Sequence, residues 1–572
     1  MRQEAGGPGV ALSSPSGETA RMGKRTHAAV QLGPWGLTIG QIEAVARRGS
    51  AVKVTAEAKA AMKRSRGVVE RALGDGKPHY GINTGFGSLA KQRIGPDDLR
   101  ALQRNLVRSH SAGVGEPLRP ELVRAMMVVL AGSLARGLSG VRPVVVETLC
   151  GMINGGVTPV IPSIGSVGAS GDLAPLAHLA LALIGEGEAI LDPDFRAPSL
   201  RATDFSRRIP AARALTQAGL KPVTLEAKEG LALINGTHLM CAEGALLCAD
   251  ARTLMTAAIT ALAMSMDACR ATHTFLDVRL YHARQLETAA AVAMSLRDLL
   301  DHSQIAQSHV ENDPRVQDPY SLRAAPTVLG AVIEAVDQVE RAFRRELHAV
   351  TDNPLVFPQG VVELVAKAGA GSNGVKGGSF VRAIKSAADV VISGANFHGM
   401  PLAMPLDHLA IAVAHVAGIS ERRTYLMTGA FEPESHLKPF LAPRPGLQSG
   451  LMIAQYTAAA CVNELIGLAN PASVANVPTC AGMEDYNSYG PRSAAKARRG
   501  IELARRVVAI EMLCAAQGLE GHRPLRSGDG VERAVKQIRE VVPTLKEDRP
   551  LTADIEAITT LIADGAFAAE AG

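Results

Sequence analysis

The sequence predicts a mainly α-helical protein built around an elongated bundle of long helices. Apolar residues recur at helical spacing over much of the chain, and aromatic residues make up only 3% of it. Alternation of β-branched residues is confined to short pieces such as Val157–Ile161 and Val361–Val365, which argues against a large sheet. Long helices rich in Ala, Leu and Met can bury their apolar stripes only against one another, so a bundle is expected.

The expected elements begin after an N-terminal tail. Residues 1–31 are rich in Gly, Ser, Pro and charged residues and lack periodicity, which predicts disorder. The first helix is predicted from Thr38 onward, where Ile39 and Ile42 begin a helical spacing. The same spacing predicts further helices over residues 121–138, 173–184, 239–268, 286–300, 328–350, 405–419 and 500–517.

The composition excludes several classes of protein. Sixty Lys and Arg against 55 Asp and Glu give a net charge of +5 without a long basic run, so neither nucleic acid nor an acidic membrane is an expected partner. The seven cysteines show no C-x-x-C spacing, so a zinc or redox site is not expected, and a reduced cytoplasmic protein fits best. Apolar stretches such as Thr253–Met266 are shorter than the roughly 20 residues that a bilayer requires.

One glycine-rich segment matches a dinucleotide-binding pattern. Residues Gly369–Gly374 read G-x-G-x-x-G, follow the apolar run Val361–Val365 and precede a helical pattern expected from Phe380. No second strand follows at the spacing of a βαβ unit, and the chain holds 56 glycines. An ordinary loop is therefore expected here, and NAD binding is not.

The strongest chemical signal is a glycine-dense loop from Gly165 to Asp172 that leads into the helix predicted over residues 173–184. An isolated loop of this kind is interpreted as a tight turn capped by Asp172. Residues 168–176, however, read Gly-Ala-Ser-Gly-Asp-Leu-Ala-Pro-Leu, which resembles the signature of the aromatic amino acid ammonia-lyases and of the histidine ammonia-lyases most closely.

This resemblance implies a prosthetic group made from the chain itself. In the family, a glycine nitrogen attacks the alanine carbonyl, two waters leave, and the serine becomes the methylene of an electrophilic 4-methylidene-imidazol-5-one (MIO). Here the group would form from Ala169, Ser170 and Gly171, without NAD, pyridoxal phosphate or a metal. The residue types suit this chemistry, because a glycine nitrogen is unhindered and a β-hydroxyl can be eliminated. The following helix is expected to direct its positive N-terminal end toward the group.

Two further motifs are similar to family motifs that surround this group. Tyr80–Gly87 is similar to a mobile N-terminal loop whose tyrosine, here Tyr80, is the base. Leu233–Thr237 is similar to a motif whose asparagine, here Asn235, contacts the prosthetic group.

The segment Val316–Arg323 is similar to a longer family motif. The resemblance implies that Arg323 binds the substrate carboxylate, a task that suits a planar guanidinium. It also implies that Gln317, together with Asn235, holds the amine and the ring of the substrate. Tyr320 in the same motif, and two further residues in later motifs, complete the predicted catalytic set: Phe397 and Glu484.

Substrate selectivity is expected at a second group of residues. Ser109 and His110 resemble the pair found in histidine lyases, and Glu484 aligns with a pocket glutamate that can hydrogen-bond an imidazole. Met483 departs from the usual glutamine, and neighbouring positions also differ, so a substituted imidazole stays open as the substrate. A phenylalanine or tyrosine ammonia-lyase and an MIO-dependent 2,3-aminomutase are the alternatives.

The resemblance also implies the organisation of the whole molecule. It predicts a fold of the fumarase/aspartase-like superfamily and a homotetramer whose active sites combine residues from several subunits, with an amino acid as the substrate. Within one chain we expect four parts, of which the tail is the first. These are the tail at 1–31, an N-terminal MIO-bearing region at 32–235, a central helical bundle at 236–545 with an insertion of one loop and helix at 360–390, and a C-terminal segment at 546–572.

Overall fold

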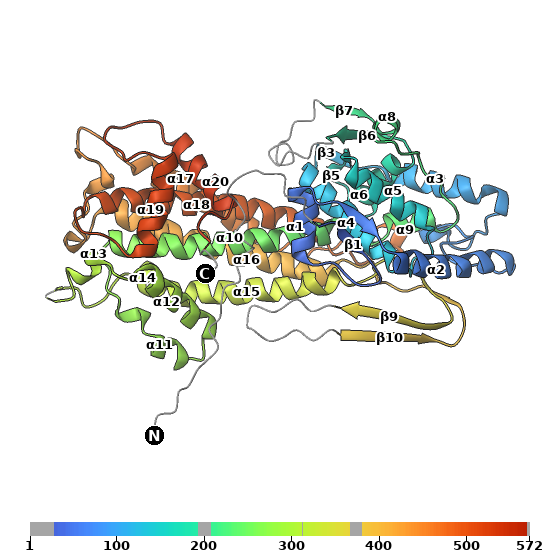
Figure 1. Ribbon diagram of the computed structural model, residues 1–572, viewed down its shortest axis with the longest axis horizontal. Coiled ribbons are helices and arrows are strands. Elements are labelled where there is room, and N and C mark those ends of the chain that lie inside the picture. Colours follow the sequence, from blue (N-terminus) through green and yellow to red (C-terminus); the bar gives the residue numbers. More distant parts are fainter. Residues whose placement is uncertain (1–27, 193–206, 312, 367–379, 569–572) are drawn as a thin grey trace, which may run out of the picture.

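Long helices run side by side along an elongated molecule, and a smaller mixed region covers one end of them (Figure 1). This computed structural model describes residues 28–192, 207–311, 313–366 and 380–568. The arrangement confirms the prediction of a mainly α-helical fold with an elongated central bundle.

The bundle is centred on α10, which has 31 residues. Because its residues are apolar on nearly every side, it is buried among other helices all round. It packs against α4, α15, α16 and α18. The long helices of the bundle are α10 His238–Ala268, α12 Glu287–Leu299, α15 Ala325–Glu346, α16 Met400–Gly429, α17 Met452–Leu468, α18 Gly490–Glu520, α19 Asp529–Val541 and α20 Thr552–Ala563. Short helices in its connections are η3 Thr274–Leu276, α11 Val278–His282, α13 Gln304–Gln307, α14 Tyr320–Arg323, η4 Pro433–Ser435, η5 Pro439–Leu441 and η6 Cys480–Gly482.

Two of these helices, α10 and α16, are long and apolar enough to cross a membrane. In the folded chain, however, 72% of the most apolar window of α10 and 56% of that of α16 are buried against other elements. Their length and apolarity therefore match their places in the bundle core.

A buried ion pair joins α16 to α18. Arg423 and Glu511 are both fully buried, and the Arg423 Nη2 donates to Glu511 Oε2 at 2.8 Å. Ser265 on α10 donates to the other carboxylate oxygen at 2.7 Å. Because each charge has a partner, the pair fixes the register of three helices without leaving an unpaired buried charge.

The smaller region that covers one end of the bundle is formed by the N-terminal part of the chain and combines short helices with small strands. The strands form a parallel pair β1–β2, an antiparallel pair β3–β5 and an antiparallel sheet in the order β4-β6-β7. Its helices are α1 Ile39–Arg48, α2 Ala56–Gly74, η1 Gly87–Leu89, η2 Pro96–Asp98, α3 Leu99–His110, α4 Pro120–Ala135, α5 Pro143–Asn154, α6 Leu173–Leu183, α8 Ala211–Gln217 and α9 Glu229–Ile234. Its strands are β1 Val30–Leu32, β2 Val52–Val54, β3 Val114–Pro117, β4 Val157–Pro159, β5 Pro162–Ile164, β6 Glu188–Leu191 and β7 Arg208–Pro210.

Several boundaries differ from the expectations. The helices predicted over 405–419 and 500–517 extend further as α16 and α18, because polar turns such as Ser420–Arg423 continue each helix where the apolar spacing fades. The predicted tail falls mostly outside the described residues, but Val30 and Gln31 lie in β1, so the prediction of disorder is wrong there.

The expected insertion at 360–390 is a hairpin. Strand β9 (Gly360–Ala366) pairs antiparallel with β10 (Phe380–Ser386), and β8 (Leu355–Phe357) pairs with β11 (Val390–Ile392). The helix expected from Phe380 is therefore wrong: Phe380–Ser386 is a strand that pairs with β9, and a run this short does not distinguish a helix from a strand by its apolar spacing. The glycine-rich segment 369–374 lies outside the described residues.

Candidate active site

The loop that carries Ala169, Ser170 and Gly171 connects β5 to α6. Gly168 and Gly171 both have positive φ values, +70° and +74°, which side-chain-bearing residues rarely adopt. The Ser166 hydroxyl donates to the Gly171 carbonyl at 3.2 Å and closes the loop on itself. The loop is thus a defined turn rather than a loose connection.

Gly171 and Gly236 lie in backbone contact. They form an isolated parallel bridge, and the Asp172 N–H donates to the Gly236 carbonyl at 2.8 Å. A Cβ on Gly171 would lie only 2.1 Å from the Gly236 oxygen, so this approach requires glycine. The contact brings the Asn235 motif directly beside the Ser170 loop.

Asp172 joins the loop to the long helix α10. Its side chain accepts hydrogen bonds from the backbone N–H groups of Leu239 (2.9 Å) and Met240 (3.0 Å), and its Oδ1 lies 3.1 Å from Ser166 Oγ. Burial raises the pKa of Asp172 to about 7. The interpretation of Asp172 as a cap is confirmed, but it caps α10 and not α6, which it precedes. The N-termini of both helices therefore meet at the loop.

The Ser170 hydroxyl points at Glu484. It lies 2.7 Å from Glu484 Oε1, while Thr479 Oγ1 donates to Glu484 Oε2 at 2.8 Å. Glu484 follows the short helix η6 and is held there by a bridge between Thr479 and Glu484. Residues 314 positions apart in the chain thus meet at one hydroxyl.

Tyr80 and His110 lie within electrostatic range of the same glutamate. Burial raises the pKa of the half-buried Tyr80 phenol, the Gly87 backbone opposes this by hydrogen-bonding the phenol, and Cys480 and Glu484 add to the rise. Burial lowers the pKa of His110, which the Leu106 carbonyl and Glu484 partly offset.

The tautomer of His110 follows from its hydrogen bonds. Its Nδ1 lies 2.9 Å from the Leu106 carbonyl, which can only accept, so in the neutral ring Nδ1 carries the proton. Nε2 is then left as an acceptor. Ser109 donates its hydroxyl to the Leu106 carbonyl at 3.2 Å and lies 3.1 Å from His110 Nδ1, so the predicted pair is a single hydrogen-bonded unit.

The remaining predicted residues of this end surround the loop at different depths. Asn235 is 5% exposed, and its Oδ1 has no hydrogen-bond partner among the described residues. Phe397 is half-buried in the turn before α16, where the Gly399 N–H donates to the Gly168 carbonyl at 3.2 Å. Met483 is 67% exposed in the single chain, so its side chain is free to meet a ligand or another chain.

The predicted carboxylate-binding residues lie elsewhere. Arg323 Nη2 donates to Gln317 Oε1 at 2.8 Å, and the guanidinium lies 4.4 Å from the centre of the Tyr320 ring. Their helix α14 contacts the far part of α16, where Arg423 donates to the Ser321 carbonyl at 3.2 Å. Figure 1 shows α14 at the end of the bundle opposite α6.

The separation along α16 is large. Arg423 and Gly399, which touches the Ser170 loop, are 24 positions apart, so the helix spans roughly 36 Å between them at about 1.5 Å per residue. One chain therefore does not bring Gln317, Tyr320 and Arg323 to Ser170. Of the three, Arg323 lines a separate cavity of about 220 Å³, together with Tyr281 and Arg284 among other residues.

The residues around the loop fit an MIO group. Asn235 is buried beside Gly236, and an amide N–H of its side chain can donate to the carbonyl of a ring built on residues 169–171. The Gly171 nitrogen carries no Cβ crowding, and the Ser170 hydroxyl is hydrogen-bonded to a carboxyl group. Among the described residues, no group of three or more His, Cys, Asp or Glu side chains could hold a metal ion.

Sequence reasoning did not place two residues that shape this site. Thr479 holds Glu484, and Ser488 Oγ donates to the Gly168 carbonyl at 3.0 Å. It named Asp172 as a cap but did not show that Asp172 links the loop to α10. Thr479 and Ser488 are ordinary polar residues, and only the fold brings them to the loop.

Comparison with known proteins identifies the family. A sequence model of the aromatic amino acid lyases, described as "Aromatic amino acid lyase", matches residues 37–540. Histidine ammonia-lyase of Sorangium cellulosum is 47% identical over 537 residues, covering 93% of this chain and 97% of that protein. Histidine ammonia-lyase of Anaeromyxobacter dehalogenans is 45% identical over 532 residues, covering 93% and 98%.

Solved structures agree with this match. Histidine ammonia-lyase from Trypanosoma cruzi superposes with a TM-score of 0.80 at 38% identity, covering 94% of each chain. Tyrosine aminomutase from Streptomyces globisporus superposes with a TM-score of 0.82 at 31% identity, covering 94% of this chain and 98% of that one. The chain therefore belongs to the aromatic amino acid lyase family and is a carbon–nitrogen lyase.

Proposed function

We propose that the protein is an ammonia-lyase that eliminates ammonia from L-histidine, or from a close imidazole amino acid, to give trans-urocanate or its substituted equivalent. The observation that carries the proposal is the Ala169–Ser170–Gly171 loop, with Gly171 against Gly236 and Ser170 on Glu484. It stands in a chain that is 41–47% identical to several histidine ammonia-lyases over nearly its whole length.

The prosthetic group proposed for this loop is MIO, formed autocatalytically from Ala169, Ser170 and Gly171 with loss of two waters. When formed, it supplies an electrophile that binds the substrate's amino group and makes ammonia a better leaving group. Asn235, which is buried beside Gly236, is proposed to contact it by donating a side-chain amide N–H to its carbonyl. The N-termini of α6 and α10 direct partial positive charge to the same place.

The proton chemistry is assigned to Tyr80. Removal of the poorly acidic β-proton of the substrate requires a base, and a phenol held beside the loop can act as one after losing its own proton. A Tyr80 side chain that is half-buried near Glu484 is suitably placed for this role. Phe397 adds apolar surface next to the loop.

Recognition of the imidazole is assigned to His110 and Glu484. With Nδ1 donating to the Leu106 carbonyl, His110 presents Nε2 as an acceptor for an imidazole N–H. Glu484 offers a second polar contact. A phenyl ring would cover these half-buried polar groups without hydrogen-bonding them, which costs about 1–3 kcal/mol and favours an imidazole.

The carboxylate of the substrate is assigned to Arg323, with Gln317 and Tyr320 beside it. Since one chain keeps these residues far from Ser170, the proposal includes a homotetramer in which another subunit supplies them. Exposed apolar residues support an interface along α16 and α17: Met404, Ile411, Tyr425, Ile453, Tyr456 and Ile466. We place the enzyme in the cytoplasm, in the breakdown of histidine, and the seven free cysteines are compatible with a reducing compartment.

An ammonia-release assay with purified protein tests the proposal. Histidine, ring-substituted histidines, phenylalanine and tyrosine are supplied in turn, and an imidazole substrate is expected to be fastest. Intact-protein mass is expected to be lower than the encoded mass by two waters. Ser170→Ala should remove both the mass loss and the activity.

The alternatives give different results in the same assay. Faster turnover of phenylalanine or tyrosine would identify an aromatic lyase of the other kind and contradict the roles of His110 and Glu484. A β-amino acid detected by chiral analysis would identify a 2,3-aminomutase. An active protein of full encoded mass would contradict the prosthetic group itself.

A further inference from the structure

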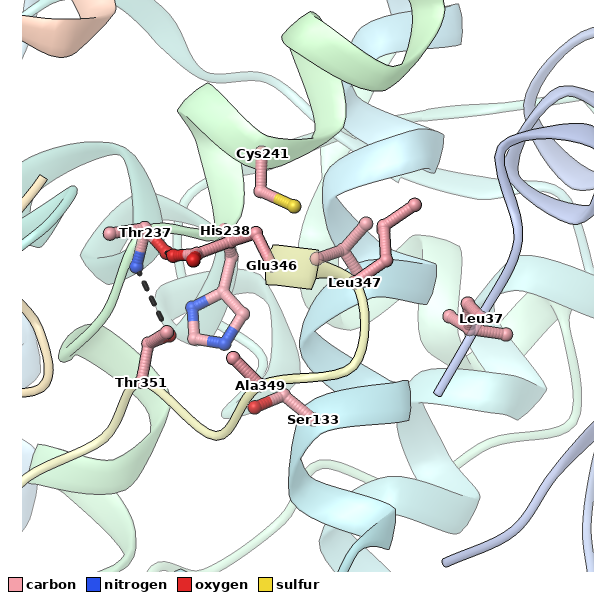
Figure 2. Close-up of a pocket in the computed structure, with 10 residues that line it drawn as sticks. Leu37, Ser133, Thr237, His238, Cys241, Glu346, Leu347, Ala349 and Thr351 are labelled. Carbon is pink, nitrogen blue, oxygen red and sulfur yellow. Dashed lines mark hydrogen bonds between the residues drawn. The ribbon is translucent and has the colours of Figure 1, made fainter. Parts of the chain in front are cut away.

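A small buried cavity lies beside Gly236, the residue that contacts the Ser170 loop. It has a volume of about 10 Å³, close to the ~10–15 Å³ that one water occupies. Its polar lining comes from Ser133, Thr237, His238, Glu346 and Thr351 (Figure 2). The cavity is thus polar and sized for one small molecule.

His238 is the unexplained residue of this cavity. Its side chain is 2% exposed, and neither ring nitrogen has a hydrogen-bond partner in the described chain. Burial lowers its pKa to about 3, so the ring is neutral and has one N–H donor and one acceptor. Buried groups of this kind are nearly always satisfied by protein or by an ordered water.

The position of His238 connects the cavity to the Ser170 loop. A Cβ on Gly236 would lie 2.5 Å from His238 Cε1, so the ring packs directly on the Gly236 backbone. On its other side Gly236 contacts Gly171. Gly236 is therefore held between the imidazole and the loop.

The neighbours of His238 are themselves fixed by hydrogen bonds. Thr237 Oγ1 donates to Glu346 Oε1 at 2.6 Å, and the Thr237 N–H donates to Thr351 Oγ1 at 3.3 Å. These bonds leave the imidazole as the lining group without a partner. A water in the cavity would complete the network.

We propose that this cavity holds one internal water bonded to His238, and that His238 is through it a positioning residue for Asn235–Thr237 behind the Ser170 loop. The positioning part rests on the proposed function, because it concerns the loop from which MIO would form. The water itself does not depend on that function.

A high-resolution crystal structure of the full-length protein tests the water directly. One water is expected at about 2.7–3.2 Å from a ring nitrogen of His238. A dry cavity, or a ring nitrogen bonded straight to Glu346, would overturn the proposal. The presence of the internal water is tested independently of the proposed function. If the wild-type mass shows no loss of two waters, the proposed function is rejected, but the water at His238 is not.

Three variants test the positioning role, with the rate of the two-water mass loss as the readout. His238→Gln keeps a donor and an acceptor and should mature within about threefold of wild type. His238→Leu keeps a similar volume without polar atoms and should mature about 5- to 150-fold more slowly, as expected for a lost buried hydrogen bond. Cys241→Ala, on the same cavity wall, is the control and should mature normally.

Equal maturation of the leucine and glutamine variants would overturn the positioning role, because packing alone would then suffice. Melting temperatures show whether each variant folds. If His238→Leu does not fold, Ser133→Ala removes a lining hydroxyl from helix α4 and should slow maturation at least about twofold. An unchanged rate in that variant would overturn the role as well.

Discussion

Tyr80 is the residue whose proposed role has the clearest pH signature. Burial raises its pKa above the ordinary value of 10, and a base must be deprotonated to act. The active fraction should therefore increase with pH through the neutral and mildly alkaline range, and log kcat/KM should rise with a slope near one. A pH–rate profile measures this. A flat profile between pH 7 and 9 would assign proton removal to another group.

Replacement of Tyr80 separates catalysis from maturation. Tyr80→Phe should lower kcat by about 10²- to 10⁴-fold, the range for a lost general base, and should flatten the alkaline limb. Its mass should still be lower than the encoded mass by two waters, because the phenol is not among the groups that cyclise. A variant with wild-type kcat would refute the assignment.

His110 is the residue on which substrate choice is expected to depend. His110→Phe removes the Nε2 acceptor and adds apolar surface, so kcat/KM for histidine should fall about 5- to 150-fold. Activity on phenylalanine relative to histidine should rise in the same variant. Steady-state kinetics with both amino acids measures the ratio, and an unchanged ratio would contradict the role.

The sequence motifs identified candidate site residues that the spacing of residues along the chain would not have identified. Ser170, Tyr80, Asn235 and Glu484 do come to one end of the molecule. Their convergence was not visible in the residue order, since it depends on the Gly171–Gly236 contact and on the turn at Thr479. Arg323 shows the opposite case, because its motif gave a role but no information on which chain supplies it.

Among the helices, α10 is the element most directly coupled to the Ser170 loop. Asp172→Ala would remove the acceptor of two N-terminal backbone N–H groups and the contact with Ser166, which should destabilise the protein by about 2–4 kcal/mol. It should also slow the two-water mass loss. Thr38→Ala is the matched control, because Thr38 caps α1 away from the loop. It should cost about 1 kcal/mol and leave maturation unchanged.

The same variant has a predictable pH dependence. The folded pKa of Asp172, about 7, lies above the ordinary value of 3.8. Protonated Asp172 therefore adds stability that is fully present below pH 4 and is lost as the pH rises through 7. Denaturation of wild type and Asp172→Ala should give a larger difference in unfolding free energy at pH 5 than at pH 8. The reverse order would contradict the buried, proton-binding carboxyl.

Element prediction succeeded where burial imposes a strong period. The buried residues of α15 recur at helical spacing, and α10 was predicted as a long apolar run of helical length. The ends of α16 and α18 were missed because polar residues such as Arg423 are buried there through partners, which a pattern of apolar residues does not reveal. The β9–β10 hairpin was half missed, since the short mixed run Phe380–Ser386 has the apolar spacing of a helical turn as well as of a strand.

The whole molecule has two incomplete parts that complement each other. One end carries the Ser170 loop without a guanidinium for the substrate carboxylate, and the other carries Arg323 beside an open cavity. Exposed apolar residues lie along α16, which connects these ends, and along α17, which packs against it. A closed, symmetric oligomer would bury those residues and bring the two ends of different chains together. Light scattering should therefore find a tetramer, and a fully active monomer would contradict the assembly.

Co-expression of two inactive variants tests whether the sites are shared between chains. Ser170→Ala and Arg323→Ala should each be inactive alone. If every site takes Ser170 from one chain and Arg323 from another, random mixing in equal amounts leaves roughly a quarter of the sites with both residues intact. Purified mixed tetramers, obtained with two different affinity tags, should recover activity on that order.

Mixing the two proteins after separate purification is the control and should recover little if the subunits do not exchange. Mixed tetramers without activity would contradict shared sites, because Arg323 and Ser170 of the same chain would then have to act together. Since the two are separated by roughly 36 Å along α16, that would require a large rearrangement of the chain.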